Sequence, residues 1–302
     1  MKTNITHSPE IEAYLDRISG LETRGGDART KEVVRRIVSD LFHTIEDLDV
    51  QPDEFWSAIA FLTSLGQARE VALLSPGLGF DHFLDLRSDE IDRQLGIEGG
   101  TPRTIEGPLY VAGAPLVKGE ARLDDGTEEG EVLFVEGRVL GEDGTPVPGA
   151  VVEVWHADTK GNYSFFDPTQ SPFNLRRSIE TDGDGRYRFQ SIMPAGYACP
   201  PDGPTQELLD RLGRHGRRPA HVHFFVHAEG HRHLTTQINI ADDPNAFDDF
   251  AFATRNGLVP AIERRDGAAR IRFDFVLQES VAGAPETEVH RPRAEARVEA
   301  AE

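Results

Sequence analysis

One seventeen-residue segment, RRPAHVHFFVHAEGHRH at residues 217–233, constrains both the fold and the chemistry of this chain. Successive residues of a β-strand point to opposite faces of a sheet. A strand here therefore turns three apolar side chains toward one face: Val222, Phe224 and Val226. Such a face belongs in the core of a β-sandwich, whereas the opposite face begins with His221 and His223. Two imidazoles placed in this way can hold one metal ion.

Further short runs with alternating apolar and polar residues follow one another from residue 131 onward. With the histidine segment included, the runs that predict strands are residues 131–140, 150–157, 186–192, 220–228, 234–240 and 271–277. Turn sequences such as GEDGTPVPGA separate some of them. This order of elements predicts an antiparallel β-sandwich or barrel. The sequence DGDG at residues 182–185 predicts a hairpin turn, because it lacks the rest of a calcium-binding EF-hand loop.

The first hundred residues have the periodicity of helices. Within residues 30–48, apolar side chains recur at steps of three and four: Val33, Val34, Ile37, Leu41, Ile45 and Leu48. A second helix is expected over residues 51–66, which begin near a proline and end at a glycine. Helical turns are also expected around residues 67–74 and 81–95. This block has more apolar faces than it can bury alone, so it packs on the rest of the chain or on another copy.

These patterns predict an α+β protein, in which an N-terminal helical domain precedes an antiparallel β-sandwich domain. The expected boundaries are residues 1–105 for the helical domain and residues 106–280 for the sandwich. Residues 281–302 read as a polar, loose C-terminal tail. Inside the sandwich, residues 160–218 are rich in proline, glycine and aspartate and have little strand pattern. A long irregular segment inside a compact domain is usually functional.

Composition excludes several classes of protein. The 52 acidic residues against 32 basic ones give a net charge of -20, which argues against a nucleic-acid partner. The single cysteine, Cys199, excludes an intramolecular disulfide and a cysteine-based zinc cluster. The N-terminus lacks the apolar run of a signal peptide, and no stretch is apolar for long enough to insert in a membrane. We therefore expect a cytoplasmic protein.

The histidine pair needs further ligands to complete a metal site. A carboxylate would give the facial triad of ferrous iron, and a third histidine would suit zinc. His231 and His233 form a rival pair, although they lie in an expected turn. The irregular segment contains Tyr163 and Tyr197, and two phenolates with two imidazoles suit a hard ferric ion. Two phenolates and a hydroxide would neutralise Fe(III), which lowers the electrostatic cost of burying the site.

Four longer motifs identify a family. They are GNYSFFD, NLRRSIETDGDGRYRFQSIMPAGY, GPTQELLDRLGRHGRRPAHVHFFV and GHRHLTTQIN. In this order they resemble the intradiol ring-cleavage dioxygenases, and most closely the branch that acts on catechol. The likeness runs from the N-terminal helices to about residue 280. It implies four ligands to Fe(III), which are Tyr163, Tyr197, His221 and His223, and it leaves the other histidines of the segment outside the site.

The resemblance also implies the residues around the substrate. Arg218 and Gln237 match positions that flank bound substrate, and with Tyr197 they make up the implied catalytic set. The implied walls of the substrate pocket are Leu73, Pro76, Ile105, Pro108, Leu109, Phe250 and Ala251. The implied reaction is the intradiol cleavage of catechol by O2 to cis,cis-muconate, in the β-ketoadipate route of aromatic breakdown. The family further implies a homodimer formed through the N-terminal helices, with a phospholipid retained at the interface.

Other functions remain open from the sequence. A member of the same family could prefer a substituted catechol. A ferrous dioxygenase could use His221, His223 and a carboxylate to cleave outside the diol. A third alternative is a sandwich without enzyme activity that binds a small molecule, in which the histidines have structural roles.

Overall fold

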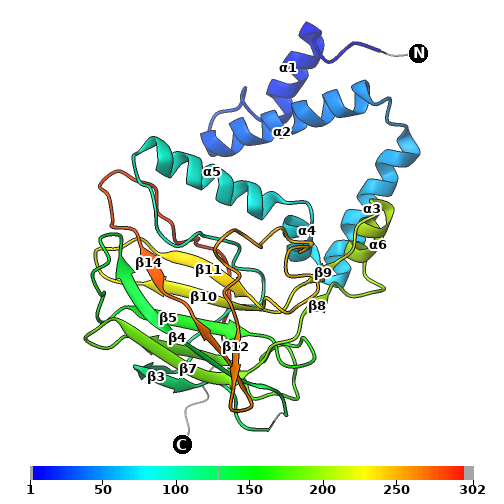
Figure 1. The fold of residues 1–302 in the computed structure, drawn as a ribbon. Coiled ribbons are helices and arrows are strands. Elements are labelled where there is room, and N and C mark those ends of the chain that lie inside the picture. The colour runs from blue at the N-terminus through cyan, green and yellow to red at the C-terminus, as the bar shows by residue number, and fades with distance from the viewer. Residues whose placement is uncertain (1–2, 128, 296–302) are drawn as a thin grey trace, which may run out of the picture. The chain divides into compact units, whose positions relative to one another are not determined.

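The computed structural model describes residues 3–127 and 129–295 (Figure 1). Contacts within the chain divide it into two compact units, Met1–Gln67 and Ala68–Glu302. Residues 68–105, which the sequence places in the helical domain, thus group with the sheets. Among the described residues, no helix is long and apolar enough to cross a membrane.

The first unit consists of helices α1 (Pro9–Ile18), α2 (Ala28–Asp47) and α3 (Pro52–Ala68). The predicted helices over residues 30–48 and 51–66 are thereby confirmed. The Asp27 side chain caps α2 by accepting a hydrogen bond from the Thr30 amide at 2.7 Å. None of the described residues of α2 is buried, although its sequence has an apolar face.

In the second unit, helices α4 (Val71–Gly77) and α5 (Phe80–Gln94) occur where helical turns were expected. Helix α6 (Pro204–Arg211) lies in the segment that the sequence left irregular. The Glu70 carboxylate, just before α4, accepts a hydrogen bond from the Thr205 amide in the first turn of α6 at 3.0 Å. This buried contact attaches α6 to the start of α4.

Two sheets form the body of the second unit (Figure 1). Within the described residues, the first sheet has five strands in the order β11-β10-β5-β6-β2. In that order they span Leu234–Asn239, His221–His227, Val151–His156, Arg176–Glu180 and Leu116–Lys118. The second sheet has the order β12-β13-β4-β7-β3, with β14 also paired to β4. These span Glu263–Arg265, Ala268–Arg272, Val132–Gly141, Arg186–Ile192, Glu120–Arg122 and Phe275–Leu277.

Two shorter pairs complete the strands. Strand β1 (Val111–Ala112) pairs in parallel with β15 (Ala294–Glu295), and β8 (Tyr197–Ala198) pairs antiparallel with β9 (Arg217–Arg218). The expected sandwich is confirmed. In the first sheet β10 pairs antiparallel with its neighbours β5 and β11, and in the second sheet β4 pairs antiparallel with β7. Parallel pairs join β2 to β6, β3 to β7, and both β13 and β14 to β4.

The turn at residues 182–185 does not close a hairpin. It connects β6 to β7, and these strands belong to different sheets. Strand β6 pairs with β5, whereas β7 pairs with β4. The prediction of a hairpin was wrong because the local turn chemistry does not specify which strands become neighbours. Gly185 still adopts a left-handed conformation, with φ of 70°, as a tight turn requires.

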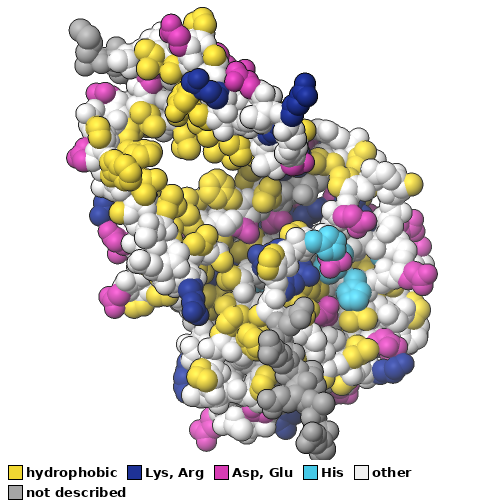
Figure 2. Space-filling view, turned by 180° about the vertical axis from the view of Figure 1, so that it is seen from behind, with side chains coloured by type: hydrophobic (Ala, Val, Ile, Leu, Met, Phe, Trp, Pro, Cys, Tyr) yellow, Lys and Arg dark blue, Asp and Glu magenta, His cyan; other side chains and the backbone are white. Residues whose placement is uncertain are grey.

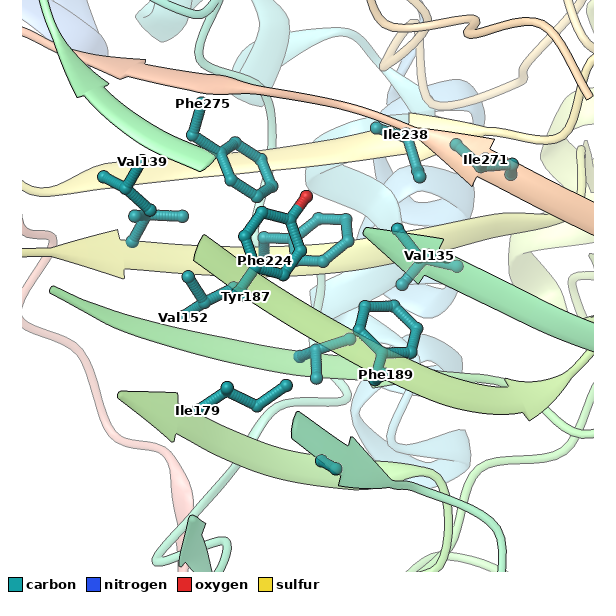
Figure 3. Packing of buried hydrophobic residues seen from close by; sticks show 14 of the residues in the cluster. Val135, Val139, Val152, Ile179, Tyr187, Phe189, Phe224, Ile238, Ile271 and Phe275 are labelled. Carbon is teal, nitrogen blue, oxygen red and sulfur yellow. The ribbon is translucent and has the colours of Figure 1, made fainter. Parts of the chain in front are cut away.

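The hydrophobic core lies between the two sheets (Figure 3). The apolar face of β10 points into it, as predicted, through Val222, Phe224 and Val226. Phe224 contacts Phe275 of β14 edge to face, with ring centroids 4.9 Å apart. Burial of one such side chain contributes about 1.5–3 kcal/mol to stability. This apolar face fixes the orientation of β10. The opposite face, which carries His221 and His223, is therefore directed away from the core.

A candidate metal and substrate site

The two histidines at the start of β10 form the centre of the site. His221 and His223 lie two residues apart on the same face of the strand. Both are buried, and their Nε2 atoms are 2.9 Å apart. The Nδ1 atom of His221 lies 2.6 Å from the carbonyl oxygen of Pro219. A proton on this nitrogen would donate to that carbonyl and leave the Nε2 lone pair free for a metal ion.

Two tyrosines converge on the histidine pair. Tyr163 lies in the loop after β5 and is buried, and its hydroxyl is 3.4 Å from Nε2 of His221. Tyr197 of β8 is partly buried, and its ring lies 5.7 Å from that of Tyr163 at 90°. Gly161 permits this approach, because a Cβ at that position would lie 2.8 Å from Cβ of Tyr197. The structure thus brings together the four side chains that the sequence proposed as ligands.

Burial determines the protonation of this cluster. Desolvation, followed by the charge of Arg218, holds the pKa of His221 well below its usual range. Desolvation and the neighbouring His221 have the same effect on the pKa of His223. Both imidazoles are therefore neutral near pH 7, which is the form that binds metal. Desolvation, followed by Tyr197, raises the pKa of the Tyr163 phenol well above its usual range, so its ionisation requires a cation close by.

A buried arginine lies next to the tyrosines. Arg218 forms an ion pair with Asp249 at 3.1 Å, and both side chains are almost fully buried. Its Nη2 atom donates to Oε1 of Gln237 at 2.8 Å, and its Nη1 atom donates to the hydroxyl of Tyr197 at 3.4 Å. Desolvation lowers the pKa of Arg218, but the nearby carboxylate of Asp249 and the other groups around it outweigh this effect and raise the pKa above its usual range. Arg218 is consequently a fixed positive charge beside the four proposed ligands.

The alternative ligand sets are not assembled. Among the residues that the structure describes, no group of three histidine, cysteine, aspartate or glutamate side chains could hold a metal ion. A ferrous facial triad at His221 and His223 therefore lacks its carboxylate. His233 stacks instead on His227, with centroids 5.9 Å apart, and Nδ1 of His231 lies 3.0 Å from the Glu229 carbonyl oxygen.

Comparison with known families shows which family the chain matches. Residues 105–279 match the family described as Dioxygenase, and residues 27–96 match the family described as Catechol dioxygenase N terminus. The first match alone covers more than half of the chain. The chain belongs to the intradiol dioxygenase family.

Individual members of this family are similar over most of the chain. Catechol 1,2-dioxygenase 2 of Acinetobacter lwoffii is 62% identical over 85% of this chain and 93% of its own length. Catechol 1,2-dioxygenase of Acinetobacter baylyi is 53% identical over 97% and 99%. The solved structure of catechol 1,2-dioxygenase from Pseudomonas arvilla C-1 has a TM-score of 0.92 and 52% identity, and covers 97% of this chain and 99% of that chain.

A structure named for another substrate is less similar. The solved structure of hydroxyquinol 1,2-dioxygenase from Pseudomonas putida DLL-E4 has a TM-score of 0.75 and 30% identity. It covers 89% of this chain and 100% of that chain. Among intradiol dioxygenases, this chain is thus more similar to the compared enzymes named for catechol than to this one named for hydroxyquinol.

Many of the residues proposed as walls of the substrate pocket belong to, or pack against, two buried apolar clusters. Ile105, Phe250 and Ala251 belong to one buried apolar cluster, and Leu73 of α4 packs against it. Leu109 packs against a second cluster, which contains Tyr163. Pro76 is buried in α4. Pro108 lies between Leu109 and Gly107, and a Cβ at Gly107 would lie 3.6 Å from Cε1 of His223.

Several residues around the site were not found from the sequence. Asp249, which pairs with Arg218, is one of 52 acidic residues, and nothing in its neighbourhood marks it. Trp155 stacks on His223 with centroids 4.9 Å apart and planes 6° apart. In the structure Trp155 and His223 are register partners on the neighbouring strands β5 and β10. The strand pattern of β5 predicts only which face of the sheet Trp155 occupies. The pairing of strands, however, is not readable from one strand alone.

Arg176 is the other unexpected residue. It is buried, and its Nε and Nη2 atoms donate to Oγ and the carbonyl oxygen of Ser164 at 2.9 and 3.0 Å. Its guanidinium lies 5.8 Å from the ring centroid of Tyr163. Among the described residues no carboxylate forms an ion pair with it, and desolvation lowers its pKa to about 10. A buried cation beside Tyr163 favours negative charge at that phenol.

Proposed function

We propose that this chain is a catechol 1,2-dioxygenase, which uses Fe(III) and O2 to cleave catechol between its two hydroxyl-bearing carbons. The observation that carries the proposal is the convergence of two tyrosines and two neutral histidines beside a buried arginine. In the overall reaction, one carbon–carbon bond breaks and both oxygen atoms of O2 enter the product. The product, cis,cis-muconate, thus has the composition of catechol plus O2, so no external reductant is needed.

The donor set fits a ferric ion. Tyr163, Tyr197, His221 and His223 would hold it through two phenolate oxygens and two imidazole nitrogens. The anionic oxygens suit a hard trivalent cation, and the low pKa values of the histidines leave their nitrogens available. Arg176 beside Tyr163 and Arg218 beside Tyr197 both stabilise phenolate charge. A ferric ion held there would supply a Lewis acid that the two oxygens of the diol can chelate and that activates the ring toward O2.

The two tyrosines have different environments and therefore different roles. Tyr163 is enclosed by the protein, so we propose that it remains a ligand throughout. Tyr197 is partly exposed, and its hydroxyl is in contact with Arg218. In our proposal, the phenolate oxygen of Tyr197 accepts a proton from a hydroxyl of catechol as the substrate binds. Arg218 can then donate to whichever neighbouring oxygen carries negative charge.

Arg218 supplies electrostatic stabilisation without rearrangement. Its guanidinium is held by Asp249 and Gln237, so it is already oriented before substrate arrives. Charges fixed in this way stabilise developing negative charge more than solvent does, because no reorganisation is required. We propose that Gln237 acts chiefly by holding Arg218 at the substrate.

The proposed substrate preference follows from the pocket walls. Leu73, Pro76, Ile105, Pro108, Leu109, Phe250 and Ala251 are mostly apolar, so they suit an unsubstituted ring. The carboxylate of protocatechuate would have to leave water for this surface, and burial of an unpaired charge is costly. We expect kcat/KM to be highest for catechol among catechol, hydroxyquinol, protocatechuate and heavily chlorinated catechols. A preference for protocatechuate would contradict this substrate assignment.

The helical unit supports a proposal about assembly. Hydrophobic side chains are numerous on the face shown in Figure 2 (yellow). In α2 and α3 the exposed large hydrophobic residues are Val33, Val34, Ile37, Leu41, Phe55, Trp56, Ile59 and Leu62. An exposed apolar surface of this kind is typical of an interface. We propose a homodimer through these N-terminal helices, which can retain a phospholipid between apolar faces, in a cytoplasmic enzyme of aromatic breakdown.

The visible absorption spectrum of the purified protein tests the central proposal. Tyrosinate bound to ferric iron should give a broad charge-transfer band and a wine-red colour, with one iron per chain. Addition of catechol without O2 should shift the band, and admission of O2 should yield muconate. A colourless protein with loosely bound Fe(II), or one without metal, would contradict the proposal.

A further inference from the structure

The C-terminal strap, defined here as residues 288–295, is not free of the catalytic unit. Its last residues form β15, which pairs in parallel with β1, so that Ala294 is the register partner of Val111. The pairing places the strap alongside the segment that leads from Ile105 to Val111. This pairing differs from the loose tail expected for residues 281–302, which are polar and have no strand pattern.

Two arginines of the strap hold one buried carboxylate. Arg293 donates from Nε and Nη2 to the two carboxylate oxygens of Glu106, both at 3.1 Å. Arg291 lies 3.0 Å from the same carboxylate and also donates to the carbonyl oxygen of Gly107. Glu106 is only 8% exposed. A buried carboxylate is stable only if it is paired and hydrogen-bonded, so these arginines are what keeps Glu106 inside the protein.

The backbone next to Glu106 borders the site itself. Gly107 has φ of 69°, and a Cβ at this position would lie 3.8 Å from Nε2 of His223 and 4.0 Å from Nη1 of Arg218. Residues 105–109, which we call the wall loop, therefore run along the proposed metal ligand and the proposed catalytic arginine. Three of the proposed pocket walls belong to this loop: Ile105, Pro108 and Leu109.

Arg293 also contacts the aromatic cluster behind the ligand. Its guanidinium lies 5.0 Å from the ring centroid of Phe225 and 5.4 Å from that of Tyr110. Phe225 contacts Trp155 at 4.8 Å, and Trp155 stacks on His223. Arg293 thus joins the wall loop to the strand that carries the histidines. Its contacts fix the distance between these two sides of the pocket.

From these contacts we infer that Arg291 and Arg293 are positioning residues of the substrate pocket, which act through Glu106 on the wall loop. The inference rests on the proposed function for the identity of the substrate. Without the arginines, the Glu106 carboxylate would be buried and unpaired, and its movement toward water would draw Gly107 away from His223. Since no proposed metal ligand lies in the wall loop, we expect substrate binding to suffer more than iron binding.

The test compares matched variants. The double variant Arg291→Gln and Arg293→Gln removes both charges from Glu106, and Glu106→Gln removes the carboxylate instead. The control is Arg122→Gln, because Arg122 likewise donates to both oxygens of a carboxylate, Asp124, that is 8% exposed. All three arginines have side chains that reach the surface. We therefore expect every arginine variant to fold.

Two measurements decide the matter. In the metal-free protein, amide hydrogen exchange across residues 104–110 should become about tenfold faster in the double variant and unchanged in the control. In the iron-loaded protein, KM for catechol should rise roughly tenfold while kcat stays within about twofold. Glu106→Gln leaves no buried charge to move toward water, so KM should rise less than in the double variant. Iron content and the charge-transfer band should remain those of the unaltered chain.

Failure of this inference differs from failure of the proposed function. The role of Arg291 and Arg293 would be overturned if amide hydrogen exchange across residues 104–110 were unchanged in the double variant. Faster exchange with an unaltered KM for catechol would also overturn it. If Arg122→Gln raised KM equally, a general loss of stability would explain the change. That result would also overturn the positioning role of Arg291 and Arg293. Failure of the proposed function would appear earlier, as an unaltered chain that does not cleave catechol.

Discussion

At the scale of single residues, the site is governed by which charges are buried together. Arg218 is paired with Asp249, whereas the buried guanidinium of Arg176 has the ring of Tyr163 beside it. The neutral histidines add no charge of their own. The charges of Arg218 and Arg176 partly offset the desolvation that raises the pKa of the Tyr163 phenol. In the proposed site, a trivalent cation would supply the further positive charge that the phenolates require.

Substitution of Tyr163 and substitution of Tyr197 should have different effects on the enzyme. Tyr163→Phe removes a ligand that we propose stays bound, so iron content and the intensity of the charge-transfer band should both fall. Tyr197→Phe should keep iron but lose the group that accepts a catechol proton, and loss of such a group reduces the rate by about 10²–10⁴. Iron per chain, the visible spectrum and muconate formation measure these effects. If both variants retain full iron, colour and activity, the tyrosinate site is wrong.

Asp249 provides a second prediction at this scale. Asp249→Asn keeps the shape of the side chain but removes the charge that pairs with Arg218. Removal of one partner of a buried pair costs about 3–5 kcal/mol, because the other charge stays uncompensated. We expect lower stability together with a lower kcat, since Arg218 is no longer held at one position. Thermal unfolding and kcat measured on the same preparation test this, and normal values of both would contradict the assigned role.

At the scale of elements, the strand β10 was predictable and its surroundings were not. The alternation of residues 221–227 identified the core face and the histidine face at once, because both follow from the twofold period of a strand. Strand β6 was not predicted, because its buried residues include Arg176 and an arginine in a sequence usually indicates a surface position. The two tyrosines were noted only as phenols in an irregular segment, and the resemblance to a family then implied that they are ligands, since loops have no period. Strand neighbours, such as Trp155 beside His223, depend on the pairing of distant segments.

Helix α5 carries a carboxyl group with unusual protonation. Asp85 lines a cavity of about 540 Å³ together with residues of β11, and Oδ2 of Asp85 is buried without a hydrogen-bond partner in the described structure. Desolvation raises the pKa of Asp85 from 3.8 to about 7, against the opposing charges of Arg255 and Arg103. Between these two values the folded chain holds a proton that the unfolded chain has lost. Stability from this group is therefore full below pH 3.8 and is lost as the pH rises through about 7.

Asp85→Asn should remove this dependence on pH. One pKa unit corresponds to about 1.4 kcal/mol, so the variant should be more stable than the unaltered chain by a few kcal/mol near pH 8. The difference should shrink as the pH falls toward about 5. Denaturant unfolding of both proteins across this range measures it. Asp266→Asn is the control, because that side chain is 78% exposed and should show no such change. A constant difference across the pH range would show that Asp85 is not protonated in the fold.

At the scale of the whole molecule, the proposed catalytic site and the proposed dimer interface lie in separate parts of the chain. All four proposed ligands, Arg218 and every proposed pocket wall lie within residues 68–302, the second compact unit. The first unit contributes none of them. Its α2 instead presents an amphipathic sequence whose apolar side has no described residue buried. A helix with such a sequence is stable in water chiefly when that side is covered.

The homodimer proposal can therefore be tested without disturbing the site. Ile37 and Leu41 are more than half exposed and lie one turn apart on α2, so Ile37→Asp with Leu41→Asp places two charges on the proposed interface. An unpaired charge at an apolar interface is strongly unfavourable, so the variant should sediment as a monomer at micromolar concentration, whereas the unaltered chain sediments as a dimer. The control is Arg36→Asp. Arg36 lies on the same helix, but its side chain is 80% exposed and forms an ion pair, so this variant should remain dimeric. The monomer should still bind iron, since the ligands lie in the other unit. A monomeric unaltered chain, or a variant that stays dimeric, would show that α2 does not form the interface.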